Sequence, residues 1–311
     1  MAGPSLAMEL KAFEIRVPAT TANLGPGFDS LGLALSLYNR VRVAPAPATW
    51  VELEGEGHNE LPRDETNLML RAAAELARQA GRELPPLHWQ AQHRIPLARG
   101  LGSSSAAIVA GLLVANAVLE LNRSREDLVR LAADIEGHPD NVAPALLGGL
   151  TICLPQSEPL AVLRLRPHRD VRVVLLIPDF PVSTEAARRV LPSRVPFRDA
   201  VFNLSRAAAV TAALREGRWD VLAEATDDRL HQPYRLPLMD GIVAVIRAVQ
   251  ETGKCGVALS GSGPTVAAFC PGRAKAKETA QIMKTAARRQ GIQARVLIRR
   301  PDLKGAVVQP L

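Results

Sequence analysis

The stretch Pro96-Leu97-Ala98-Arg99-Gly100-Leu101-Gly102-Ser103-Ser104-Ser105-Ala106-Ala107 joins a predicted strand to a long apolar helix. Small residues let a ligand come close to the backbone, and the free N–H groups at a helix start attract anions. This loop therefore predicts a phosphate site, although it lacks the Gly-Lys-Ser/Thr of a Walker A loop. A helix N-terminal turn without any ligand accounts for the same residues equally well.

Upstream of this loop, residues 18–27 are rich in Thr, Asn, Gly and Pro and are expected to form an irregular loop after a strand. Asn23 and Asp29 lie in or next to it, and their side chains could bind a cationic group of a small molecule. A Gly/Pro turn held by Asx hydrogen bonds is the simpler interpretation of this segment on its own.

Downstream, Glu136-Gly137-His138-Pro139-Asp140-Asn141 places four polar side chains in an expected turn after a helix end. Glu136 could complete a Mg²⁺ site, since Mg²⁺ prefers one or two carboxylates together with phosphate oxygens and water. A capped helix terminus followed by an Asx turn is the alternative. Because no second histidine lies at zinc-ligand spacing, a transition-metal site is not expected.

A third glycine-rich segment, Ser260-Gly261-Ser262-Gly263-Pro264-Thr265, lies between two predicted strands. It is either a plain hairpin turn or a turn whose backbone packs against a ligand. The pattern of the segment alone does not separate these two interpretations.

The composition indicates a globular protein of one large or two ordinary domains, with 311 residues of which 47% are hydrophobic. The three cysteines form no CxxC pair, which suits free thiols in a reducing compartment.

No signal peptide or membrane-spanning run is expected, so the sequence predicts a cytoplasmic protein. The net charge of +7 comes from scattered residues and aromatics are only 4%, which argues against a nucleic-acid partner and suits anionic small substrates.

Hydrophobic periodicity predicts a mixture of strands and helices in an α+β protein, and the polar, turn-rich stretch Gln156–Pro159 places a domain boundary that separates residues 1–157 from residues 158–311. Strands are expected over residues 13–17, 31–43, 50–53, 87–93, 150–154, 160–166 and 171–177, and helices over 67–78, 103–121 and 125–136. Three helical stretches are expected between the last of these strands and residue 250. The order strand, turn, strand, helix, strand over residues 255–298 then predicts a ferredoxin-like second domain.

Taken together, the segments resemble the GHMP kinase superfamily and, within it, the family that phosphorylates L-homoserine. The segments VPATTANLGPGFDSLGLAL, GLGSSSAA, EGHPDNVAPALLGG and ALSGSGPTVAAF follow the family's order from about residue 13 to residue 269. The resemblance implies an N-terminal α+β domain with a left-handed βαβ unit and a C-terminal ferredoxin-like domain. It also implies ATP-dependent transfer of a phosphoryl group to L-homoserine, giving O-phospho-L-homoserine on the route to threonine.

The resemblance further assigns residues to roles. ATP phosphates would bind the loop from Pro96 to Ala106, and Mg²⁺ would bind Ser104 and Glu136, with Ser103 and Ser105 as the neighbouring hydroxyls. Asp140 and Asn141 would act at the reacting hydroxyl, and the rest of the substrate pocket would be Asn23, Asp29, His138, Thr184, Arg188, Arg235 and Gly261. Because members of this family are often dimers, a homodimer is a further expectation.

The chemistry of these residue types suits an amino-acid substrate. The guanidinium groups of Arg188 and Arg235 are candidates for a clamp on a carboxylate. Asn23, Asp29 and Asp140 offer acceptors to an ammonium group. We expect Asp140 and Asn141 mainly to orient the hydroxyl, since a loose phosphoryl-transfer transition state asks little of a base. Two alternatives stay open. One is a kinase of the same superfamily acting on another alcohol such as mevalonate, and the other is a catalytically silent protein of this fold that regulates a partner.

Overall fold

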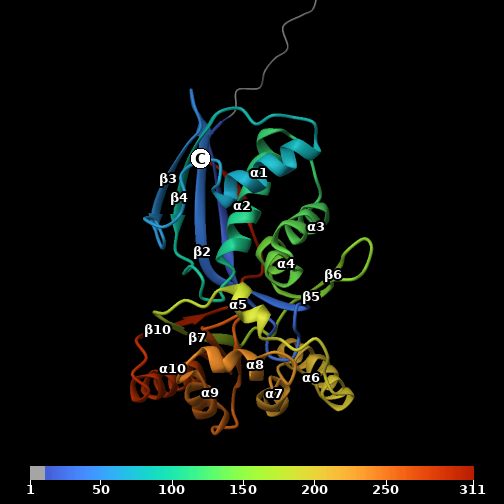
Figure 1. Ribbon diagram of the computed structural model, residues 1–311, viewed down its shortest axis with the longest axis vertical. Coiled ribbons are helices and arrows are strands. Elements are labelled where there is room, and N and C mark those ends of the chain that lie inside the picture. The colour runs from blue at the N-terminus through green and yellow to red at the C-terminus, as the bar shows by residue number, and fades with distance from the viewer. Residues whose placement is uncertain (1–10) are drawn as a thin grey trace, which may run out of the picture.

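The computed structural model describes residues 11–311, in which two sheets with their helices lie end to end (Figure 1). The first sheet has seven strands, with β11, β1, β2, β4 and β3 side by side and β5 joining β2 to β6. Its strands are β1 (Phe13–Ala22), β2 (Leu31–Pro45), β3 (Trp50–Gly55), β4 (Leu87–His93), β5 (Leu150–Leu154), β6 (Ala161–Leu165) and β11 (Val307–Pro310). All of them pair antiparallel except β3 and β4, which are parallel and are connected through α1.

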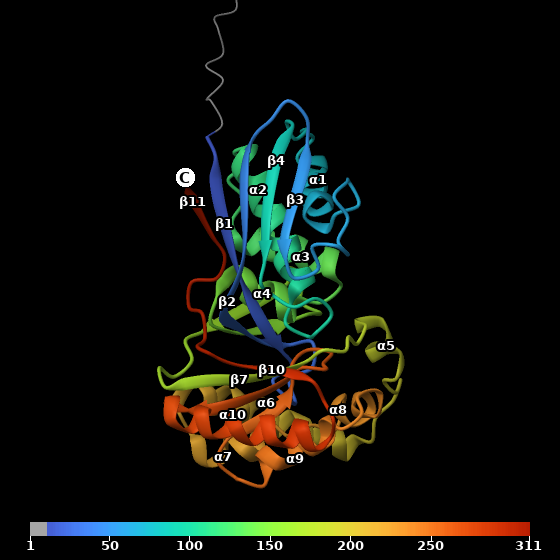
Figure 2. The same ribbon diagram turned by 90° about the vertical axis from the view of Figure 1, so that its left-hand side faces the viewer.

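Four helices cover one face of this sheet, as the turned view of Figure 2 shows. They are α1 (Leu68–Gln79), α2 (Ser103–Val118), α3 (Arg125–Glu136) and α4 (Pro139–Leu147). Local signals set their ends: the Ser124 side chain caps α3, and Gly137 ends it with a φ of 86° that favours glycine. Most of α2 is buried because it packs against α1, α3, α4 and the sheet, which explains its nearly continuous apolar sequence.

The second sheet has four antiparallel strands in the order β10, β7, β9, β8. They are β7 (Val171–Pro178), β8 (Gly256–Leu259), β9 (Val266–Pro271) and β10 (Ala294–Arg299). The helices of this half are α5 (Thr184–Arg189), α6 (Phe197–Glu216), α7 (Trp219–Ala225), α8 (Gln232–Arg235), α9 (Ile242–Gln250) and α10 (Gly272–Arg289), with the short 3₁₀ turn η1 (Leu236–Leu238) after α8. The order of strands and helices is that of a ferredoxin-like unit.

Strand β7 is buried on both faces, and one of these faces belongs to the core that the two halves share. Val173 and Leu175 belong to the larger core, which continues into the first sheet and its helices. Val174 and Leu176 point the other way, into a second core with α9 and α10. Burial on two sides explains why this strand reads as an almost continuous apolar run.

Two predicted loops are wrong. Strand β1 does not stop at residue 17 but continues to Ala22, because a register shift after Pro18 lets residues 19–22 pair with β2. The turn expected in the segment from Glu136 to Asn141 is short, because the helix α4 begins at Pro139. Pro139 takes its first position, where a helix needs no N–H, and Pro144 lies inside the helix at the cost of one hydrogen bond.

The C-terminal segment returns to the first sheet, which the sequence did not predict. Strand β11 pairs with β1, with Val308 opposite Ile15, after the chain has left the second sheet. Strand β6 also pairs in the first sheet although it lies beyond residue 157. Strand pairing therefore crosses the boundary expected after residue 157, and that boundary stays a prediction.

In the part of the chain that the structure describes, no helix has the length and apolarity to cross a membrane.

Candidate active site

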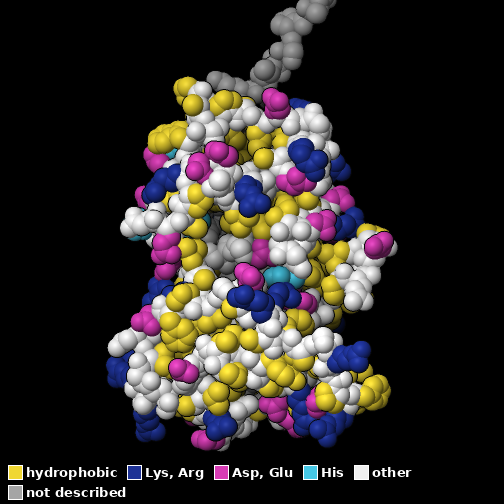
Figure 3. Space-filling model, in the orientation of Figure 1, with side chains coloured by type: hydrophobic (Ala, Val, Ile, Leu, Met, Phe, Trp, Pro, Cys, Tyr) yellow, Lys and Arg dark blue, Asp and Glu magenta, His cyan; other side chains and the backbone are white. Residues whose placement is uncertain are grey.

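A cavity of about 510 Å³ lies between the two halves of the molecule. Figure 3 shows it as a hollow between the upper and lower halves, with basic, acidic and histidine side chains gathered at its lower edge. Every segment singled out in the sequence contributes to its lining. The predicted residues on its wall are Asn23, Asp29, the loop from Pro96 to Ser104, Glu136, His138, Asp140, Asn141, Thr184, Arg188, Arg235 and Gly261.

The glycine- and serine-rich loop ends on Gly102, which is the N-cap of α2 and has a φ of 69°. No described side chain caps this helix, and its first turn carries no acidic residue, so its N–H groups are open to a ligand. A Cβ on Gly102 would lie 2.0 Å from the Thr20 hydroxyl, which explains the need for glycine. Ser105 and Ala106 are buried and do not line the cavity, unlike Ser103 and Ser104.

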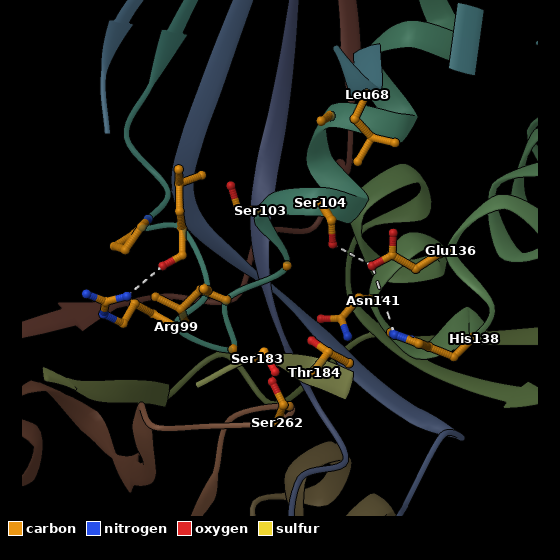
Figure 4. Close-up of a pocket in the computed structure, with 18 of the residues that line it drawn as sticks. Leu68, Arg99, Ser103, Ser104, Glu136, His138, Asn141, Ser183, Thr184 and Ser262 are labelled. Atoms are coloured by element: carbon orange, nitrogen blue, oxygen red, sulfur yellow. Dashed lines mark hydrogen bonds and ion pairs between the residues drawn. The ribbon is translucent and has the colours of Figure 1, made fainter. Parts of the chain in front are cut away.

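Ser104 and Glu136 point toward each other from the start of α2 and the end of α3 (Figure 4). The Ser104 hydroxyl donates to Oε1 of Glu136 at 2.6 Å, and the buried Ser105 hydroxyl lies 3.1 Å from the same oxygen. Nε2 of His138 is 4.0 Å from it. The Glu136 carboxylate and the exposed Ser104 hydroxyl therefore lie side by side next to an open helix start. Mg²⁺ binds oxygen ligands of this kind together with phosphate oxygens.

Asp140 lies between two donors at the start of α4. Its Oδ1 is 2.6 Å from Nδ1 of His138 and accepts from Nδ2 of Asn141 at 3.3 Å. The Thr20 hydroxyl donates to Oδ1 of Asn141 at 2.7 Å, which fixes the orientation of that amide. Burial lowers the pKa of His138, but the hydrogen bond to Asp140 and the charges of Asp140 and Glu136 outweigh it, so the net pKa is raised.

Arg188 and Asp29, expected at opposite ends of a substrate, are paired with each other. Nη1 and Nη2 of Arg188 donate to the two carboxylate oxygens of Asp29 at 3.0 and 2.8 Å. This hydrogen bonding raises the pKa of the Arg188 guanidinium, although burial opposes it. The pair joins α5 of the second half to the loop that follows β1.

Arg235 is 2% exposed, which is unusual for a guanidinium group. Its Nε donates to the carbonyl of Ala187 at 3.1 Å and its Nη1 to the carbonyl of Gly261 at 3.1 Å. Burial lowers its pKa, and the nearby charge of Arg188 adds to this effect. Among residues 11–311 it forms no ion pair with a carboxylate. A buried cation of this kind on a cavity wall is a site for an anionic group of a ligand.

The turn between β8 and β9 packs against the other two loops. The Ser260 hydroxyl is 2.9 Å from the Thr21 hydroxyl and donates to the carbonyl of Gly100 at 2.6 Å. The carbonyl of Gly261 accepts from Nδ2 of Asn23 at 3.0 Å. The three loops therefore form one continuous wall of the cavity.

Part of the lining was missed by the sequence analysis. Ser183 and Ser262 line the cavity beside the predicted residues Thr184 and Gly261, but the sequence does not predict them as site residues. The end of the cavity near the start of α1 is lined by Leu61, Pro62, Thr66, Asn67, Leu68 and Met69. The only local signal in that stretch is the Asn67 cap, whose side chain accepts from the N–H of Met69 at 2.9 Å.

Comparison with known proteins points in one direction. Residues 67–149 match the GHMP kinases N terminal domain, and residues 210–289 match the GHMP kinases C terminal domain. A homoserine kinase of Moorella thermoacetica is 44% identical over 94% of this chain and 99% of that protein, and one of Thermus thermophilus is 45% identical over 91% and 94%. The crystal structure of homoserine kinase from Cytophaga hutchinsonii superposes with a TM-score of 0.86 at 27% identity, covering 99% of both chains.

Proposed function

Because this chain belongs to the GHMP kinase family and, within it, to the homoserine kinases, we propose that the cavity between its two halves is the active site. The chain is an ATP-dependent enzyme that phosphorylates L-homoserine to O-phospho-L-homoserine, a step toward threonine. One observation carries the placement of this reaction in the cavity. A single space holds both an uncapped helix start and a buried arginine without a carboxylate partner among the described residues.

The ATP phosphates are assigned to the loop from residue 96 to residue 104 and to the start of α2. The open N–H groups of that helix, together with the Ser103 and Ser104 hydroxyls, neutralise charge without a lysine. The apolar end of the cavity, which contains Leu61, Leu68 and Met69, suits the flat face of a nucleoside base. The side chains of Ser105 and Ala106 are buried behind the loop, so these residues contribute to the nucleotide site through the backbone of the helix start rather than through their side chains.

Mg²⁺ is assigned to Glu136 and the Ser104 hydroxyl, completed by phosphate oxygens and water. When bound there, the ion would neutralise negative charge on the phosphate groups. The 2.6 Å separation of the two protein oxygens supports this assignment, because both can face one small cation. Ser104 rather than Ser103 or Ser105 is the proposed hydroxyl ligand, since it alone both lines the cavity and contacts Glu136.

The amino-acid end of L-homoserine is assigned to the wall formed by α5, α8 and the loop after β1. Arg235 binds the substrate carboxylate, because its buried charge lacks another described counterion. Arg188 and Thr184 lie on the same wall. Asp29, Asn23 and the Gly261 turn form the side that receives the ammonium group, with Asp29 already oriented by Arg188.

The reacting hydroxyl is assigned to Asp140 and Asn141, with His138 holding Asp140 in place. Oδ1 of Asp140 already accepts from two neighbours, which leaves its other oxygen for the substrate hydroxyl. These side chains orient the hydroxyl toward the phosphoryl group, and its proton leaves late in a loose transition state. Transfer then breaks the bond between the γ-phosphorus and its bridging oxygen and forms the bond from that phosphorus to the hydroxyl oxygen.

ATP turnover with Mg²⁺ against L-homoserine, L-threonine, L-serine, shikimate and mevalonate tests the proposal. A strong preference for L-homoserine, with O-phospho-L-homoserine as the product, is expected. Preference for mevalonate would contradict the ammonium pocket and leave the phosphate site standing. Tight ATP binding without turnover of any alcohol would favour a regulatory protein instead.

The homodimer and the cytoplasmic location expected from the sequence stay predictions. Sedimentation velocity would measure the oligomeric state.

A further inference from the structure

His231 is a fully buried histidine immediately before α8 that has no role in the assignments above. Its Nε2 lies 2.7 Å from the carbonyl oxygen of Gly25. Because a carbonyl can only accept, Nε2 carries a proton. Nδ1 is 3.3 Å from Nη1 of Arg235, so the imidazole accepts a hydrogen bond from the guanidinium.

The remaining hydrogen bonds of Arg235 show what this contact does. Nη1 also donates to the carbonyl of Gly261, and Nε donates to the carbonyl of Ala187. Both hydrogens of Nη1 and the hydrogen of Nε are therefore used within the protein. Nη2 has no hydrogen-bond partner among residues 11–311, although Arg235 lines the cavity. The three bonds hold the guanidinium plane so that one nitrogen is left for a ligand.

His231 also connects two walls of the cavity. Gly25 lies in the loop that carries Asn23 and Asp29, whereas Arg235 belongs to the second half of the molecule. The Phe28 ring of the same loop packs 5.4 Å from the imidazole and 5.1 Å from the Arg235 guanidinium carbon. One imidazole thus sets the separation between the proposed ammonium side and the proposed carboxylate side.

We propose that His231 is a positioning residue which, as a neutral Nε2–H imidazole anchored to Gly25, orients Arg235 for the substrate carboxylate and thereby selects an α-amino acid. This inference rests on the proposed function, in which Arg235 binds that carboxylate.

The surroundings keep the imidazole neutral. Burial and the charge of Arg235 lower the pKa of His231, against the opposing charge of Asp228. The Asp228 carboxylate lies 3.5 Å from Nε2 but is already occupied by the N–H groups of Leu230 and Gln232. A protonated ring would turn an N–H toward the guanidinium and lose the acceptor on which Arg235 depends.

Two substitutions separate the two bonds of the imidazole. Asn at position 231 puts an amide oxygen near the place of Nδ1, whereas Gln puts its amide group near the place of Nε2. We expect His231→Gln to raise the KM for L-homoserine about tenfold with the KM for ATP unchanged, because a hydrogen bond to a charged group is lost. His231→Asn should raise the KM for L-homoserine less. Thr226→Val, another buried polar residue of this half that does not contact Arg235, is the matched control.

A double-mutant cycle with Arg235→Ala decides the proposal. If His231 acts through Arg235, His231→Gln adds no further rise in the KM for L-homoserine once Arg235 is absent. An undiminished rise in that background, a rise shared equally by the KM for ATP, or no rise in a folded His231→Gln enzyme would overturn the inference. If His231→Gln does not fold, His231→Asn serves as the test instead. The inference would then be overturned if His231→Asn raised the KM for L-homoserine as much as Arg235→Ala does. If Arg235→Ala itself leaves the KM for L-homoserine unchanged, the proposed carboxylate site is wrong instead.

Discussion

Asp140 shares one carboxylate oxygen between His138 and Asn141, and this geometry suits an orienting role better than proton removal. We therefore predict that Asp140→Asn lowers kcat at saturating substrates by less than about tenfold, because an amide can still orient the hydroxyl. Steady-state phosphorylation rates measure this, with Asp170→Asn, an exposed carboxylate, as the control. A loss of about 10⁴-fold, the upper range for removal of a general base, would show that Asp140 takes the proton.

His93 is another residue whose protonation state follows from its contacts. Oδ1 of Asn39 accepts from the N–H groups of Arg94 and Ile95, at 2.8 and 3.0 Å, so Nδ2 of Asn39 donates to Nδ1 of His93. The ring is therefore neutral, with its proton on Nε2, and burial lowers its pKa. The unfolded chain then takes up this proton first as the pH falls, which costs stability.

The prediction from His93 concerns acid stability. The stabilisation linked to the lowered pKa of His93 is fully present above pH about 6.5, the ordinary pKa of histidine. It is lost as the pH falls below that value. Between pH 7.5 and 5.5 the unmodified protein should lose more stability than His93→Gln, by at most about 1.4 kcal/mol per pH unit. Urea unfolding at both pH values measures this difference. Equal losses in the two proteins would contradict a lowered pKa; His231, whose pKa is also lowered, is present in both and cancels.

At the scale of elements, the junction between the phosphate loop and α2 depends on one glycine. Gly102→Ala would place a Cβ 2.0 Å from the Thr20 hydroxyl, which also orients Asn141. We predict a rise of about 10²-fold or more in the KM for ATP together with a fall in kcat, since both the helix start and the reacting end would move. Gly81→Ala is the matched control, because Gly81 also has a positive φ but has nothing within 4 Å. Equal effects of the two substitutions would mean that backbone strain alone is responsible.

At the scale of the whole molecule, the C-terminal strand β11 follows the second sheet in the chain and returns to the edge of the first sheet, where it pairs with β1. Deletion of residues 306–311 would remove one of the two strands that flank β1, including Val308 opposite Ile15, and Arg125 would lose the Ala306 carbonyl. We predict a fall of about 3 kcal/mol in the free energy of unfolding, from lost apolar burial and strand hydrogen bonds. Urea denaturation measures it, with deletion of the exposed Leu311 alone as the control. An unchanged midpoint would show that β11 contributes nothing to stability.

Features that depend on neighbours along the chain were predictable from the amino-acid order alone. Ser124 and Gly137 bound α3 through a side-chain cap and a left-handed backbone, and the glycines before α2 mark the proposed phosphate loop. The four recognised segments also predicted the family and the residues around one cavity. Such signals are readable because capping, turn formation and periodicity are settled within a few residues.

Contacts between distant groups, in contrast, follow from how the folded halves pack. Asp29 pairs with Arg188 across 159 residues, and His231 reaches the Gly25 carbonyl across 206. Neither contact has a local signal, because each depends on how the second half packs against the first through the core that the two halves share. The helix α4 was missed for a related reason: its two prolines resemble turn residues, and packing against the sheet compensates the hydrogen bond that Pro144 cannot make. Long-range packing therefore determines the protonation states and ion pairs of this site, which composition and spacing do not encode.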